Sequence, residues 1–178
     1  MATWIVLLRG VNVGGANKLS MAALRDVMSD LGHSSVSTYI QSGNVVITSD
    51  RDDRSGLATE ICAAITASFG LAVSAVLRTP DELRAALDMN PFTTVEGDAR
   101  VLITFLSDKP TAADVAKLDA ERFAPDRFEV VGSELYGYYA HGSGRSKMTL
   151  DYFEKSLHVK GTSRNLNTVA KLIELSTR

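Results

Sequence analysis

The residues best suited to bind a ligand lie in a loop close to the start of the chain. Residues 9–20 hold two cations, two asparagines and two adjacent glycines: Arg9, Lys18, Asn12, Asn17, Gly14 and Gly15. Glycine permits the positive φ angles and the close approach that aim backbone N–H groups at a ligand. The cations and amides add donors. The loop therefore predicts an anion-binding site, with a strained surface connection as the alternative.

The elements on either side of this loop would position it. Residues 4–8 form an apolar run typical of a buried strand, and Ser20 begins an amphipathic helix. A helix N-terminus carries free N–H groups and a partial positive charge, which favours an anion there. The loop contains neither Gly-x-Gly-x-x-Gly nor the Walker pattern, so its spacing alone indicates no established nucleotide fingerprint.

Three further segments are rich in hydrogen-bonding side chains. They are the turn 41–44, the basic loop 141–147 and residues 162–168, where Thr162 or Ser163 could cap the last helix. Each has a structural alternative: a hairpin turn, a linker and a capped helix start. The candidate ligand-binding residues in these segments are Gln41, Ser42, Asn44, Ser146, Lys147, Thr162, Arg164 and Asn165.

The spacing of apolar residues predicts two similar halves. In the first half the expected order is strand, helix, strand, strand, helix, strand, which is typical of the ferredoxin-like or split βαβ arrangement. The second half repeats this order but ends in an extra helix in place of a clear closing strand. We therefore predict an α+β fold of two ferredoxin-like halves in tandem, residues 1–92 and 93–178, with helices packed on antiparallel sheets.

Composition and charge limit the class of protein. The 178 residues are 45% hydrophobic and 22% charged, as in ordinary soluble domains. No apolar run approaches the roughly 18 residues of a membrane helix, so we expect no membrane association and a cytoplasmic location. The net charge of −2 divides into +3 for residues 1–25, −9 for residues 26–140 and +4 for residues 141–178. This asymmetry favours a local anion site over a broad nucleic-acid surface.

The sequence offers no catalytic constellation. The three histidines lie far apart in the sequence, so we expect no metal and no cofactor, and no Ser-His-Asp arrangement can be recognised. Cys62, the single cysteine, reads as a buried, inert thiol. Tyr136, Tyr138 and Tyr139 on an expected strand could stack on bases, although packing in the core or at an edge is the more common role.

Several motifs occur together along nearly the whole chain. They are Leu-Leu-Arg-Gly-Val-Asn-Val-Gly-Gly at residues 7–15, Asn17-Lys18, Thr38-Tyr39-Ile40-Gln41-Ser42-Gly43-Asn44, Asn90-Pro91-Phe92, Ser146-Lys147 and Thr162-Ser163-Arg164-Asn165. In this combination the chain resembles the bacterial domain-of-unknown-function family numbered 1697. The resemblance implies an α+β fold with two ferredoxin-like halves, and it implies no established reaction, substrate or cofactor.

These observations favour one function and leave others open. We expect a small anionic, phosphate-bearing ligand, such as a nucleotide or a phosphorylated metabolite, at a site joining both halves. An enzyme acting on such a ligand, an RNA or single-stranded DNA binding module, and a structural role in which the motifs only join the halves are the alternatives. The sequence indicates no oligomeric state.

Overall fold

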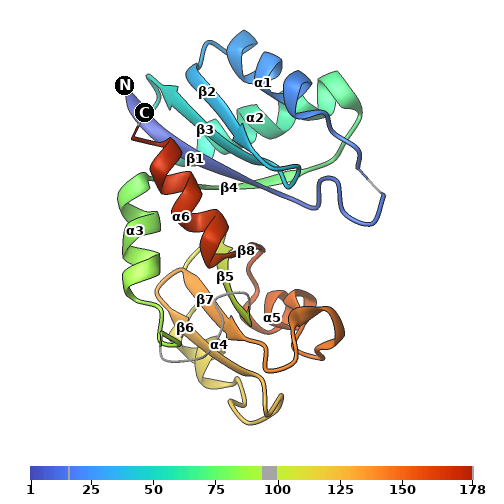
Figure 1. Ribbon diagram of the computed structural model, residues 1–178, viewed down its shortest axis with the longest axis vertical. Coiled ribbons are helices and arrows are strands. Elements are labelled where there is room, and N and C mark those ends of the chain that lie inside the picture. Colours follow the sequence, from blue (N-terminus) through green and yellow to red (C-terminus); the bar gives the residue numbers. More distant parts are fainter. Residues whose placement is uncertain (16, 94–99, 178) are drawn as a thin grey trace. The chain divides into compact units, whose positions relative to one another are not determined.

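The computed structural model describes residues 1–15, 17–93 and 100–177. The chain has an α+β fold with two four-stranded antiparallel sheets (Figure 1). It divides into two compact units, which we call unit 1 (Met1–Arg84 with Ala170–Arg178) and unit 2 (Ala85–Val169). The predicted division into two halves, residues 1–92 and 93–178, stays a prediction.

Unit 1 contains the first sheet, whose strand order is β2-β3-β1-β4. Its elements in chain order are β1 (Ala2–Arg9), α1 (Met21–Asp30), β2 (Ser34–Tyr39), β3 (Asn44–Ser49), α2 (Arg54–Phe69) and β4 (Ser74–Arg78). Alternate residues of β1, such as Val6 and Leu8, pack with Leu24 of α1 and Ile61 of α2 in one core. This core forms because apolar residues recur at every second position in β1 and at helical spacing in α1 and α2.

Unit 2 contains the second sheet, with strand order β6-β7-β5-β8. Its elements are β5 (Val101–Leu106), α4 (Ala112–Ala116), β6 (Arg127–Val131), β7 (Glu134–Tyr138), the short 3-10 turn η2 (Ser143–Arg145), α5 (Leu150–Leu157) and β8 (Gly161–Asn165). Leu106, Leu135 and Phe153 lie in its core. Two helices, α3 (Pro80–Asp88) and α6 (Leu166–Leu175), each run across the division between the units.

The predicted helix start at Ser20 is confirmed, and two other helix ends have residue types suited to capping. Ser20 caps α1 by accepting a hydrogen bond from the backbone N–H of Ala23, and Gly70 ends α2 in the left-handed conformation. At the start of α3 the Thr79 hydroxyl accepts from the backbone N–H of Glu82, while a Glu82 carboxylate oxygen accepts from that of Thr79. This reciprocal pair is a capping box.

The expected end of the second half was wrong. Residues 161–165 do not open the last helix: they form β8, which pairs antiparallel with β5 and closes the second sheet. Neither Thr162 nor Ser163 is a cap, because Asn165 has that role and its Oδ1 accepts from the backbone N–H of Thr168 at 2.8 Å. The strand is polar and lacks alternating apolar residues, since its pairing with buried β5 decides its conformation.

His33 follows α1 and is buried, with 7% of its surface exposed. Its Nε2 has no hydrogen-bond partner among the residues that the structure describes. Burial lowers the pKa of His33 from its ordinary value of 6.5, an effect that the charge of Glu60 opposes and that of Arg51 reinforces. A buried imidazole with an unpartnered nitrogen favours the neutral form, because an added proton would have to be desolvated.

This burial predicts a loss of stability in mild acid. The unfolded chain takes up a proton on His33 as the pH falls through 6.5, whereas the folded state resists it, so the free energy of unfolding falls below that pH. In urea unfolding between about pH 7.5 and about pH 5.5, His33→Phe should lose less stability than the parent protein. His141→Gln, which removes an exposed histidine, is the control; a parent-like loss in His33→Phe would contradict the prediction.

Candidate functional site

The glycine-rich loop of unit 1 is held in shape by its two asparagines. The Asn12 side-chain amide donates to the backbone carbonyls of Leu19 at 2.9 Å and Gln41 at 2.8 Å, and its Oδ1 accepts from the N–H of Leu19. The Asn17 amide donates to the carbonyl of Gly10 at 2.9 Å. Both asparagines have positive φ, which this residue type tolerates better than most. Their amides thus build the loop.

The structure brings this loop and the turn 41–44 together. The backbone N–H of Leu8 donates to the carbonyl of Gly43 at 2.8 Å, next to the bond from Asn12 to Gln41. Asn44 is fully buried and donates to the carbonyl of Tyr39. Gln41, Ser42, Gly14, Gly15 and Lys18 lie exposed at the surface, and Arg9 is half-buried.

The candidate residues of β8 lie in a different setting. Arg164 is 8% exposed, and its Nη1 donates to the Thr162 hydroxyl at 2.6 Å and to the carbonyl of Ser163 at 2.9 Å. Desolvation lowers the pKa of Arg164 to about 10, so the guanidinium stays charged at neutral pH. Thr162 and Arg164 are buried residues of β8, whereas Asn165 is exposed and caps α6.

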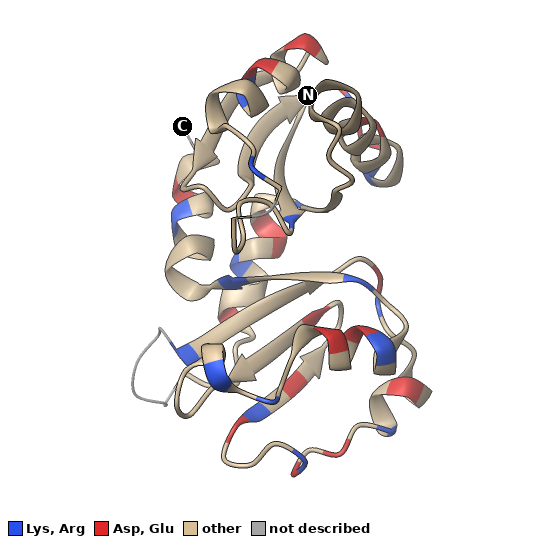
Figure 2. Ribbon diagram, turned by 90° about the vertical axis from the view of Figure 1, so that its right-hand side faces the viewer, with Lys and Arg blue, Asp and Glu red and all other residues tan. Residues whose placement is uncertain are grey.

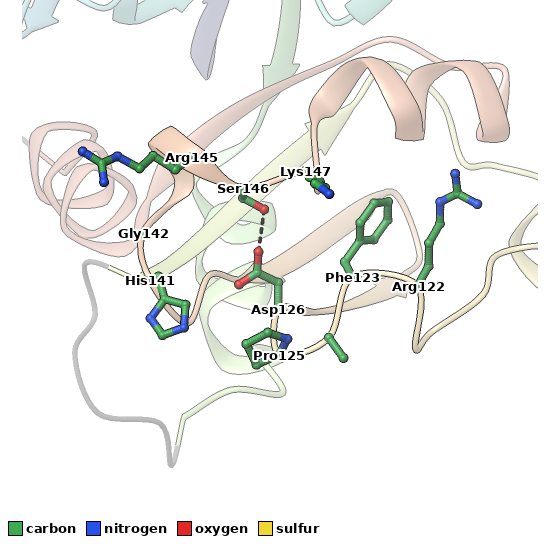
Figure 3. A pocket seen from close by; sticks show the side chains of 10 residues that line it. Arg122, Phe123, Pro125, Asp126, His141, Gly142, Arg145, Ser146 and Lys147 are labelled. Atoms are coloured by element: carbon green, nitrogen blue, oxygen red, sulfur yellow. Dashed lines mark hydrogen bonds between the residues drawn. The ribbon is translucent and has the colours of Figure 1, made fainter.

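The remaining two candidates, Ser146 and Lys147, line a pocket of unit 2 with a volume of about 450 Å³ (Figure 3). One wall is the loop before β6 and the other is the basic loop before α5. The lining residues are Arg122, Phe123, Ala124, Pro125, Asp126, His141, Gly142, Arg145, Ser146 and Lys147. The pocket does not include Thr162, Arg164 or Asn165.

Asp126 fixes the basic loop to the other wall. One carboxylate oxygen accepts from the backbone N–H of Ala140 at 2.8 Å. The other accepts from the Ser146 hydroxyl (Figure 3). The Ser146 oxygen in turn accepts from the backbone N–H of Met148 at 2.9 Å. Ser146 therefore positions the loop, and Thr149 caps α5 by accepting from the backbone N–H of Tyr152.

Three cations line the pocket. Arg122, Arg145 and Lys147 form no ion pair with any residue in the described part of the chain. Arg122 lies over the rings of Tyr152 and Phe123, at 5.1 and 5.7 Å from their centroids. Acidic and basic residues are otherwise interspersed along the ribbon of each unit (Figure 2). The pocket thus combines positive charge with an aromatic side.

Sequence reasoning missed the first wall of this pocket. Residues 122–127 read Arg-Phe-Ala-Pro-Asp-Arg, a short polar connection between two expected elements. An aromatic residue beside two cations in such a connection was a usable signal, because loops placed by a rigid sheet often carry binding residues. Its partner loop 141–147 could not be assigned to it without knowledge of how β6 and β7 pair.

The tyrosines do not form an exposed stacking platform. Tyr136 is fully buried and its hydroxyl donates to the carbonyl of Ala86 at 2.7 Å; burial raises its pKa. Tyr138 packs against Phe92, and Arg127 lies over both rings. Cys62 is half-buried, and desolvation raises the pKa of its thiol, which makes it a poor nucleophile.

Comparisons with known proteins establish the family. The model of DUF1697, a family of proteins of unknown function, matches residues 1–136, and the chain belongs to this family. The structure of a conserved bacterial protein from Streptococcus pneumoniae is similar, with a TM-score of 0.74, 24% sequence identity and coverage of 98% of each chain. At this identity the similarity concerns the fold alone. Comparison with curated proteins gives no match.

Two kinds of feature are absent from the described residues. None of the helices there is long and apolar enough to cross a bilayer. Within the same residues, His, Cys, Asp and Glu side chains form no group of three or more that could hold a metal ion.

Proposed function

We propose that the pocket of unit 2 binds a small anionic, phosphate-bearing molecule. The observation that carries the proposal is the set of three cations, Arg122, Arg145 and Lys147, around one pocket without an ion-pair partner in the described chain. Cations left unpaired at a concave surface attract anions, because the low-dielectric walls concentrate the field. Arginine and lysine are also the side chains that recognise phosphate oxygens most often.

Asp126, the acid in the described lining of the pocket, holds the basic loop in place. Both oxygens of Asp126 accept hydrogen bonds from within unit 2, one from Ala140 and one from Ser146. These bonds hold the basic loop in place, so the positions of Arg145 and Lys147 along the backbone are set before a ligand arrives. In Figure 3 Arg122 and Arg145 extend at opposite ends of the pocket, with Lys147 between them. Their long side chains can swing toward an anion.

The sharpest test measures pyrophosphate binding by isothermal titration calorimetry at low salt. Lys147→Ala and Arg145→Ala should each weaken binding by about tenfold or more, since a hydrogen bond to a charged group contributes about 1.5–3 kcal/mol. Lys109→Ala, which removes an exposed lysine of the same unit, should leave the affinity unchanged. A parent protein that binds neither pyrophosphate nor nucleotides, or parent-like affinity in Lys147→Ala, would overturn the proposal.

Two finer points belong to this proposal. We infer that each unit is ferredoxin-like: the element order β-α-β-β-α-β and the matching strand orders β2-β3-β1-β4 and β6-β7-β5-β8 support this. A cytoplasmic location also remains part of the proposal. The expectation that residues of unit 1, such as Lys18, contribute to the same ligand site stays a prediction.

A further inference from the structure

We infer that the ligand of this pocket is a nucleotide, with its base against the wall formed by Phe123, Ala124 and Pro125 and its phosphate against the loop 142–147. This inference rests on the proposed function and narrows it from any phosphate-bearing molecule to one class. It follows from the two chemically different walls of the pocket, which the hydrogen bond between Asp126 and Ser146 joins (Figure 3).

The first wall contains three consecutive uncharged residues, with the half-buried ring of Phe123 at its centre. Three aromatic neighbours fix this ring: Tyr152 at 4.9 Å, Phe153 at 6.3 Å and Phe128 at 6.4 Å between centroids, all edge-on or tilted. A ring that is fixed in advance loses little conformational entropy when a ligand packs on it. Because Arg122 lies over this ring at 5.7 Å from its centroid, a planar base would pack on the part of Phe123 that lines the pocket. Phosphate or a sugar phosphate would leave this wall in contact with water.

The charge of Asp126 also favours a ligand that has an uncharged group besides its phosphate. Its carboxylate stands between the walls, so a phosphate group beside it would meet a like charge. Arg145 and Lys147, on either side of Ser146 in the chain, would offset this repulsion for a phosphate at their side chains, and an uncharged group fits best beside the carboxylate itself. The volume of about 450 Å³ agrees with this, because it lies in the range of pockets that hold ligands much larger than a phosphate ion.

The experiment titrates the parent protein with pyrophosphate, ribose 5-phosphate and the four common nucleoside monophosphates. At least one nucleoside monophosphate should bind about tenfold more tightly than ribose 5-phosphate, because stacking of a base on an aromatic side chain contributes about 1–3 kcal/mol. Phe123→Leu should reduce this ratio to about one and leave ribose 5-phosphate affinity unchanged, whereas Phe123→Tyr should keep the ratio. Lys147→Ala should weaken both kinds of ligand equally.

The outcomes separate this inference from the proposed function. If ribose 5-phosphate and pyrophosphate bind but no nucleotide binds more tightly, the nucleotide is excluded and the anion site stands. If none of the six compounds binds, both fail. Because the ratio is first measured on the parent protein, the conclusion does not depend on whether Phe123→Leu folds.

Discussion

The Gly43→Ala variant should lose about 3 kcal/mol of unfolding free energy and melt about 9 °C below the parent protein. Gly43 has φ of +70°, which costs an L-residue about 1–2 kcal/mol. A Cβ at this position would also lie 2.5 Å from Cγ2 of Val11 and 2.7 Å from Cβ of Leu8. Since the Leu8 Cβ is fixed to the strand backbone, the turn itself would have to move. Calorimetric or fluorescence melting checks the result.

A matched control separates the two causes. Gly14 also has a positive φ, of +59°, but a Cβ there would meet nothing within 4 Å. Gly14→Ala should therefore cost only the backbone term, about 1 kcal/mol. Equal losses in the two variants would mean that the close approach of the turn to Leu8 and Val11 contributes nothing to stability.

The Glu154→Ala variant should lose a similar amount, about 3 kcal/mol, from unit 2. Glu154 is only 6% exposed, and its carboxylate accepts from the buried backbone N–H of Gly161 at 3.0 Å and lies 3.5 Å from the ammonium of Lys160. Alanine would leave the Gly161 N–H buried without its acceptor, which costs about 1–3 kcal/mol, and would add a cavity. Urea unfolding monitored by the tyrosines of unit 2 measures the change.

Two companion variants test the explanation. Glu154→Gln keeps an oxygen for Gly161 and should lose less than Glu154→Ala. Glu129→Ala removes an exposed carboxylate on β6 and should change stability by no more than about 0.5 kcal/mol. A Glu154→Gln variant as unstable as Glu154→Ala would show that the charge, rather than the bond to Gly161, is what matters.

Elements with strong apolar periodicity were predictable from the sequence, and β8 was not. Most strands before residue 140 alternate or run apolar. The hydroxyl side chains of Ser20 and Thr79 favour the helix starts that they cap, and Gly70 suits a left-handed helix end because it has no side chain. In contrast, β8 reads Gly-Thr-Ser-Arg-Asn and owes its conformation to β5 on one side and Glu154 on the other. Such long-range pairing leaves no periodic signal in the strand itself.

The candidate site was predictable only in part, for a similar reason. The basic loop 141–147 was recognised from its composition, but its partner around Phe123 is separated from it by a hairpin and becomes a wall only when β6 pairs with β7. The asparagines of the first loop were predicted as ligand donors because their type fits that role. The structure uses their amides to join Leu19, Gln41 and Gly10 instead, which composition cannot distinguish.

The return of the chain to unit 1 at Ala170–Arg178 has a consequence for synthesis in the cell. Domains usually fold as they emerge from the ribosome, N-terminal part first. Unit 1 cannot follow that order completely, because its last segment is translated only after every residue of unit 2. The four strands of the first sheet end at Arg78 and can pair early, whereas residues 170–178 join unit 1 only after all of unit 2 has been synthesised.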